Sequence, residues 1–439
     1  MTLNLRRALL GSFAFLLLGA CAQIREYRVE LQSCTLNSPG GTHASEAEKD
    51  LCPTSAVVRV AGEAPYELAY VEVDEQGMLA NRRQAESALD LAGAPSKSGR
   101  PVHVLVFVHG WHHNAQAGDE NVKDFHEALA AISRWHNGEE VRGIYVGWRG
   151  DSLAIKGLRY FTFWDRKNTS DEVGRGALYE FLVRLERSVK PVPASPNKLV
   201  LVGHSFGASV AFNSLAQLYL QRFLEGVYAS GPGRRFRGYG DLVVLINPAI
   251  EAMRYMPFQS ALEYYSTLKQ TPPRADFSSD VIPVLMILSS EGDWATRITF
   301  PAARFFSTFP EAHLRISPLG PEDGKNRSYS EWVMDIQAVG NYAGFDTHHT
   351  ISLSPGAKPE DILGCPALPN GELVRKILAS AGSEQAFPNS GVVIKRNLEP
   401  STTAAPYWHA SLSKKIVKDH TSIVSVNLIC WINQMVTSK

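Results

Sequence analysis

Five short apolar runs, separated by long segments of mixed composition, constrain the fold of this chain most strongly. Each run has the length of a strand and ends at glycine or polar residues. The long segments between successive runs suit helical crossovers, so the pattern predicts an α/β fold with a mainly parallel, twisted sheet flanked by helices. The runs are VHVLVFVHG at 102–110, VRGIYVGW at 141–148, KLVLVG at 198–203, DLVVLINPA at 241–249 and VIPVLMILSS at 281–290.

Two more runs precede these five and predict a hairpin, SAVVRVAG at 55–62 and ELAYVEVDEQGML at 67–79. Residues 295–410 are rich in Pro, Gly, Ser and Asn, which predicts loops with short helices. We expect this segment to be an insertion before the last strand that covers part of the sheet. The amphipathic segment 251–270 is a core helix or further cap material. The whole of 55–439 is then one domain.

The first residues have the pattern of an export signal. Arg6 and Arg7 precede an apolar stretch at 8–20, which is too short to span a bilayer comfortably. The stretch ends in Leu-Gly-Ala followed by Cys21, and this sequence resembles a bacterial lipobox. In such signals the chain is cleaved before the cysteine and lipid is attached to its sulfur. An ordinary cleaved signal peptide and an N-terminal anchor are the alternatives.

The lipobox resemblance implies that residues 1–20 are a lipoprotein signal peptide and that residues 21–54 form an N-terminal tether. The membrane partner is then reached through the lipid on Cys21. Position 22 holds alanine rather than aspartate. By resemblance to known sorting rules, this predicts a bacterial cell-envelope protein, at the outer membrane if the host is Gram-negative.

The balance of charges narrows the class of protein further. Lysine plus arginine and aspartate plus glutamate each number 44, and no long basic block occurs, so nucleic-acid binding has little support.

Besides Cys21 there are four cysteines, an even number that permits disulfides in an exported protein. Cys34 with Cys52, and Cys365 with Cys430, are possible pairs. Buried free thiols are the alternative, and the sequence does not choose.

The pentapeptide Gly-His-Ser-Phe-Gly at 203–207 carries the strongest chemical signal. An apolar strand-like run precedes it, and a helix-like segment follows it. A serine between a strand and a helix on a tight turn is the arrangement of a nucleophile elbow. Ser205 is therefore the candidate nucleophile, and an ordinary serine in a structural turn is the alternative reading.

The elbow, the strand series and the FVHGW sequence together resemble the α/β-hydrolase superfamily over roughly residues 55–439. The segments VFVHGWHHNA, GWRG and TFWDRKN also resemble a poorly characterised set of bacterial members. The resemblance implies a catalytic order of serine, then aspartate or glutamate, then histidine. The acid follows the second strand after the nucleophile strand, and the histidine follows the last strand.

This order points to Asp293 as the acid, because it follows the run VIPVLMILSS, with Glu291 as the alternative. It points to His420 as the base, with His348 or His349 as the alternatives. In this reading SLSKKIV at 411–417 is the last strand and IVSVNLICWINQMV at 423–436 is the terminal helix.

The oxyanion hole of the superfamily uses two backbone N–H groups, which the resemblance assigns to Phe206 and Trp111. His109 then organises the loop after its strand. The histidines at 109, 112 and 113 lack the spacing of a metal motif, so we expect no metal and no cofactor. Three residues at strand ends could line the pocket, namely Trp148, Arg149 and Trp294. The alternative for each is packing in the core or ion pairing at the surface.

The combined expectation is a lipid-anchored serine hydrolase. Its reaction would be carboxylic-ester hydrolysis through a Ser205–His420–Asp293 triad and an acyl-enzyme. Its partner would be a small-molecule or lipid ester. A non-catalytic envelope protein for binding or assembly, built on the same fold, is one alternative. A peptidase or acyltransferase with the same triad is another.

Overall fold

The computed structural model describes most of the chain after the first 25 residues. The proposed signal peptide and Cys21 lie outside the described residues. None of the described helices has the length and apolarity that a membrane crossing requires. The described ranges are 26–136, 139–150, 163–192, 194–228, 236–267, 283–308, 311–317, 328–358, 362, 364–366, 368, 382–397 and 406–437.

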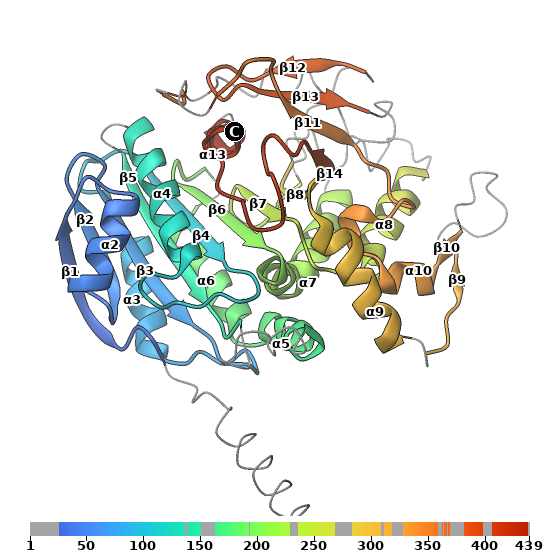
Figure 1. Ribbon diagram of the computed structural model, residues 1–439, viewed down its shortest axis with the longest axis horizontal. Helices are drawn as coiled ribbons and strands as arrows, with labels where there is room; N and C mark the ends of the chain where they lie inside the picture. Colours follow the sequence, from blue (N-terminus) through green and yellow to red (C-terminus); the bar gives the residue numbers. More distant parts are fainter. Residues whose placement is uncertain are drawn as a thin grey trace, which may run out of the picture.

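In the described ranges, twelve strands form one sheet in the order β1-β2-β3-β5-β4-β6-β7-β8-β14-β11-β13-β12 (Figure 1). The centre of this sheet, from β3 to β11, is parallel throughout. The predicted α/β class with a mainly parallel sheet is therefore confirmed. The strands are β1 (Glu30–Asn37), β2 (Ser55–Ala61), β3 (Tyr66–Glu72), β4 (Val102–Val108), β5 (Glu140–Gly147), β6 (Lys198–His204), β7 (Leu242–Ile246), β8 (Leu285–Ser290), β11 (His349–Leu353), β12 (Glu384–Ala386), β13 (Val392–Arg396) and β14 (Tyr407–Leu412).

Helices cover both faces of the sheet, which explains why its central strands are almost continuously apolar. One apolar core lies under α3 (Arg82–Gly93), α6 (Leu178–Val189), α7 (Phe206–Tyr228) and α8 (Ala252–Thr267). The other lies under α2 (Thr42–Leu51), α4 (Glu120–Trp135) and α13 (Val426–Thr437). Helix α8 contributes Tyr255 and Phe258 to the first core, as expected of a core helix. Helix α5 (Phe163–Arg175) packs on α7.

The predicted hairpin of β2 and β3 is present and antiparallel. The last strand differs from the prediction, because it ends at Leu412 instead of beginning at Ser411. Its chain then turns, since the N–H groups of Ile416 and Val417 both donate to the carbonyl of Ser413. The terminal helix lies close to where it was expected.

The segment expected to be a tether is part of the fold from residue 26 onward. Strand β1 pairs in parallel with β2, and α2 packs on α4. A disulfide joins Cys34 to Cys52, which was one of the pairings left open. Some of the charge in this segment is paired and buried.

The insertion also differs from its prediction, because part of it lengthens the sheet. Strands β11, β13 and β12 continue the sheet beyond β14, and the Cys365–Cys430 disulfide links this region to α13. The rest includes a π-helix η2 (Ala295–Thr299), α9 (Phe300–Thr308), α10 (Glu331–Ile336), the 3₁₀ turn η3 (Val339–Asn341) and a small hairpin of β9 (Arg315–Ile316) and β10 (Tyr329–Ser330). Helices α9 and α10 pack together, and α10 packs on α8.

A buried charge cluster fixes the N-terminal segment to the sheet. Arg28 and Glu48 form an ion pair, and both side chains are fully inaccessible to solvent. Glu48 also accepts hydrogen bonds from Tyr70, at 2.7 Å, and pairs with His126. Burial by itself raises the pKa of the Glu48 carboxyl, but the interactions with Arg28 and His126 outweigh it and lower the pKa to about 2.

Glu48→Gln should lower the free energy of unfolding by about 3–5 kcal/mol, because it leaves the buried Arg28 charge uncompensated. In the wild type, the pKa of Glu48 is lower in the folded than in the unfolded chain. Its contribution is therefore complete above about pH 4.5 and is lost as the pH falls to about 2. Urea unfolding at several pH values measures both effects. The control is Glu46→Gln, which changes an exposed carboxylate of the same helix; equal losses in the two variants would contradict the assignment.

Candidate active site

Ser205 occupies a strained turn between β6 and α7. Its φ is +54°, a left-handed conformation that non-glycine residues rarely adopt. The turn is held from both sides, since the N–H of Ser205 donates to the carbonyl of Ile246 at 3.1 Å and its carbonyl accepts from Ala208 at 3.1 Å. The tight strand-to-helix turn predicted from the pentapeptide is thus present at Ser205.

The glycine at position 207 makes this turn possible. A Cβ at Gly207 would lie 2.1 Å from the carbonyl oxygen of Val108 and 2.3 Å from that of His109. The first turn of α7 therefore touches the backbone at the end of β4. No larger residue fits there without moving one of these two elements.

The structure brings the three predicted triad residues together. The Nε2 atom of His420 lies 2.7 Å from Ser205 Oγ, and its Nδ1 atom lies 2.8 Å from Asp293 Oδ1. With Nδ1–H donating to the carboxylate, Nε2 is an acceptor for the serine hydroxyl proton. This is the arrangement of a general base beside a nucleophile, supported by an acid.

The alternative acid and bases lie elsewhere. Glu291 donates its backbone N–H to Leu412, whereas Asp293 is the carboxylate that contacts His420. In the extended edge of the sheet, His349 stacks on Trp408 with ring centroids 4.0 Å apart. His348 there contacts His409.

Asp293 is almost completely buried and well supplied with hydrogen-bond donors. Its Oδ1 accepts from the N–H of Ala295, at 3.0 Å, and of Thr296, at 3.2 Å, and its Oδ2 accepts from the Thr296 hydroxyl. Burial alone raises the pKa of the Asp293 carboxyl, but the interactions with His420 and Thr296 lower it below its usual value. The acid is therefore held as a carboxylate. Asn341, from the insertion, donates to Thr296 Oγ1 at 2.9 Å and extends this network.

Two residues that position the His420 loop were not identified from the sequence. His204 donates from Nε2 to the carbonyl of His420 at 2.7 Å, and burial lowers the pKa of His204 well below its usual value, which keeps it neutral. Asn247 follows β7, contacts the carbonyl of Asp419 at 3.4 Å and accepts from the N–H of Ser290 at 2.9 Å. In the sequence, the only sign of this role was that Asn247 comes directly after the end of a strand.

The loop after β4 lies beside Ser205. A Cβ at Gly110 would be 3.1 Å from Ser205 Cβ, and the ring of Trp111 lies 5.8 Å from that of Phe206. This is the place where the two oxyanion donors were expected, and their role stays a prediction.

His109 organises this loop through both ring nitrogens. Nδ1 donates to the carbonyl of Gly110 at 2.9 Å, and Nε2 accepts from the N–H of Trp148 at 3.0 Å. The Trp148 indole in turn donates to the carbonyl of His109 at 2.8 Å. Burial lowers the pKa of His109 to about 4, so the ring is neutral. Trp148 is therefore a packing residue here.

The other residues that the sequence suggested for the site make contacts with different neighbours. His113 pairs with Asp119 at 3.0 Å, and His112 stacks on Trp111. Arg149 lies 3.5 Å from Glu75. Trp294 is 60% exposed next to the acid, so it is available to a ligand at the surface.

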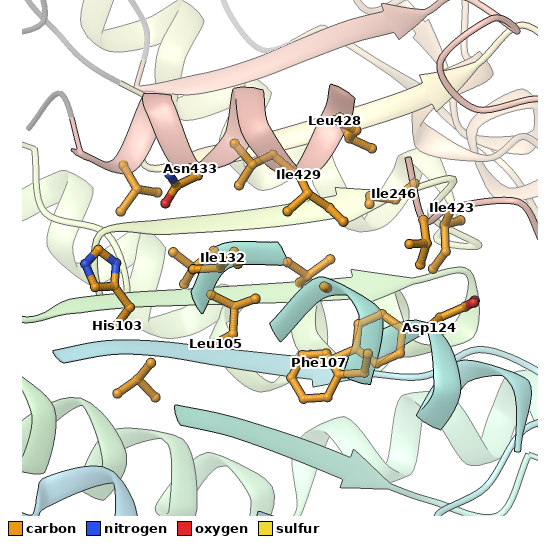
Figure 2. A pocket seen from close by; sticks show the side chains of 18 of the residues that line it. His103, Leu105, Phe107, Asp124, Ile132, Ile246, Ile423, Leu428, Ile429 and Asn433 are labelled. Atoms are coloured by element: carbon orange, nitrogen blue, oxygen red, sulfur yellow. The ribbon is translucent and has the colours of Figure 1, made fainter. Parts of the chain in front are cut away.

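Neither of two cavities in the described part of the molecule is lined by Ser205, which is itself only 4% exposed. A polar cavity of about 630 Å³ lies next to the acid, between the ends of β8 and β14 and the insertion; its lining includes Ser289, Arg297, Asn341 and His409. An apolar cavity of about 80 Å³ lies on the other face of the sheet, under α4 and α13 (Figure 2).

Comparison with known proteins identifies one family. Residues 105–380, more than half of the chain, match a family model described as "Alpha/beta hydrolase family". This range includes Ser205 and Asp293 and ends before His420. Neither a curated protein nor a solved structure gives a match.

Gly207→Ala should destabilise the protein by at least about 1–3 kcal/mol, because the added methyl group meets two backbone carbonyls that cannot rotate away. The midpoint of urea unfolding measures the loss. Gly364→Ala is the matched control, since a Cβ there meets no atom within 4 Å. If both variants unfold at the same midpoint, the close contact between α7 and β4 is contradicted.

Proposed function

Because the chain belongs to the alpha/beta hydrolase family, we propose that it is a serine hydrolase that cleaves carboxylic esters. The observation that carries the proposal is the hydrogen-bonded series from Ser205 through His420 to Asp293. Such a series requires a neutral histidine oriented by a buried carboxylate, and it serves nucleophilic attack on an acyl group.

In the proposed reaction, His420 Nε2 takes the hydroxyl proton as Ser205 Oγ attacks the ester carbonyl. The N–H groups of Phe206 and Trp111 would stabilise the oxyanion. The protonated His420 then gives its proton to the leaving alcohol, and an acyl-enzyme remains. Water, deprotonated by His420, attacks the acyl-enzyme and releases the acid and free Ser205.

Asp293 would hold His420 in the required tautomer and stabilise the imidazolium during both steps. The low pKa of its carboxyl supports this role, because the negative charge persists in mildly acidic solution. His204 and Asn247 would act as positioning residues that hold the loop of His420 by its backbone carbonyls.

We also propose that the protein is anchored in the bacterial envelope by a lipid on Cys21, as the lipobox-like sequence suggests. Anchoring would bring the enzyme close to lipid esters and to small esters that enter the envelope.

The nucleophile is tested by labelling the full chain with a fluorophosphonate and locating the adduct by peptide mass spectrometry. We expect stoichiometric label on Ser205, and no label in Ser205→Ala or His420→Ala. Hydrolysis of p-nitrophenyl esters should fall about 10⁶-fold in these two variants and about 10⁴-fold in Asp293→Asn. Ser98→Ala, which changes an exposed serine, is the control.

Failure of a folded wild-type protein to react would contradict the proposal and favour a binding or assembly role. Labelling without ester hydrolysis would favour a peptidase or acyltransferase. Added alcohol acceptors then separate these two, because only a transferase gives a new ester in preference to the free acid.

The anchor is tested by expressing the full chain in a bacterial host with labelled palmitate. Wild-type protein should carry the label and sediment with membranes. Cys21→Ser should lose the label and leave the membrane fraction, because the sulfur that accepts the lipid is gone. Equal labelling of the two proteins would show that Cys21 is not the attachment site.

A further inference from the structure

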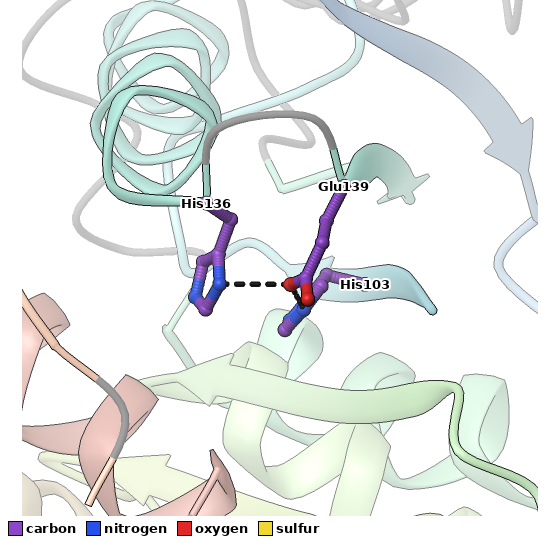
Figure 3. A group of neighbouring side chains, drawn as sticks. All are labelled: His103, His136 and Glu139. Carbon is purple, nitrogen blue, oxygen red and sulfur yellow. Dashed lines mark hydrogen bonds and ion pairs between the residues drawn. The ribbon is translucent and has the colours of Figure 1, made fainter. Parts of the chain in front are cut away.

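Two histidines and one glutamate meet far from the candidate active site (Figure 3). His103 is the second residue of β4, and His136 and Glu139 flank the turn from α4 into β5. Glu139 Oε2 lies 2.5 Å from His103 Nε2 and 2.9 Å from His136 Nδ1. Both imidazoles are more than nine-tenths buried, and the carboxylate is 27% exposed.

The His136 ring is held between Glu139 and Asn433. Its Nδ1 faces Glu139, and its Nε2 lies 3.0 Å from Asn433 Oδ1. The Asn433 amide nitrogen lies 3.9 Å from Cys365 Sγ, which orients the amide oxygen toward the ring. The ring is therefore fixed with Nδ1 toward Glu139 and Nε2 toward the Asn433 amide.

The three side chains converge as the ligands of a single cation would. The Nε2–H of His136 would donate to Asn433, and the Nδ1 lone pair would be available as a ligand. The three candidate ligand atoms already lie within 4.8 Å of one another. Zinc binds imidazole nitrogen and carboxylate oxygen at about 2.0–2.2 Å, so small side-chain movements would complete the site.

We propose that His103, His136 and Glu139 bind a divalent transition-metal ion, with Zn²⁺ as the preferred ion. Asn433 would hold the His136 ring, as outer hydrogen-bond partners of metal-bound histidines commonly do. His103 and Asn433 also line the apolar cavity of Figure 2. This site differs from the His109, His112 and His113 group that was considered from the sequence.

The ion would have a structural role. His103 and His109 are at opposite ends of β4, roughly 20 Å apart at about 3.3 Å per residue, so the ion could not reach an ester bound at Ser205. It would instead join the start of β4 to the end of α4 and, through Asn433, to α13. Binding of the ion by the folded chain alone would raise thermal stability. The inference is independent of the proposed hydrolase activity.

The test uses the full chain in detergent, without a histidine tag, after treatment with a chelator. Titration with ZnCl₂ should show one ion bound per chain, and the melting temperature should rise with zinc. Bound Co²⁺ should give visible absorption bands of a site with nitrogen and oxygen ligands. His103→Ala and Glu139→Gln should weaken zinc binding at least 100-fold, and Asn433→Ala should weaken it about 10–100-fold.

The control variant is His43→Ala, which removes an exposed histidine and should bind zinc like the wild type. If the chelator-treated wild type takes up no stoichiometric zinc, or if His103→Ala binds it equally well, the proposal is overturned and Glu139 is only an ion-pair partner of the histidines. The wild-type zinc and cobalt titrations decide this even if the variants fail to fold.

Discussion

The parallel pairing of β6, β7, β8 and β14 is the constraint on which the candidate site depends. In this register Gly203 is paired with Leu245, Leu245 with Ile287, and Ile287 with His409. The carboxyl ends of all four strands therefore lie on the same side of the sheet, and the loops that follow these strands meet there. This is how Ser205 comes within hydrogen-bond distance of a histidine 215 residues later in the chain.

Close contacts also hold these loops against one another. A Cβ at Gly292 would lie 2.0 Å from the carbonyl oxygen of Lys418, so the acid loop and the histidine loop touch directly. The hydroxyl of Ser290 donates to the carbonyl of Val417 across the same boundary. Asn341 adds a contact from the insertion to Thr296, and this links the inserted segment to the acid as well as to the sheet edge.

The sequence pointed to these three residues because the resemblance to the α/β-hydrolase superfamily supplied their order and the strand ends are visible in the sequence. Ser205, Asp293 and His420 each follow an apolar run or the last strand region, and in a parallel sheet such positions converge. The roles of side chains that depend on which residue they contact in the folded chain could not be predicted in this way. Arg28 and Glu48 look like surface charges until each is found buried against the other. His204 and Asn247 act on backbone carbonyls, which leave no mark in a sequence.

Helix α13 connects the loop of His420 with the cluster at the start of β4. This helix begins six residues after His420 and carries Asn433, which contacts His136 at the other end of the sheet. Twelve helical residues extend about 18 Å, nearly the length of a seven-residue strand. Since Trp431 and Leu428 bury the helix against the core, fixing its far end restricts the whole element. An ion held by His103, His136 and Glu139 would therefore stabilise the frame from which the loop of His420 extends, without any contact with the reacting groups.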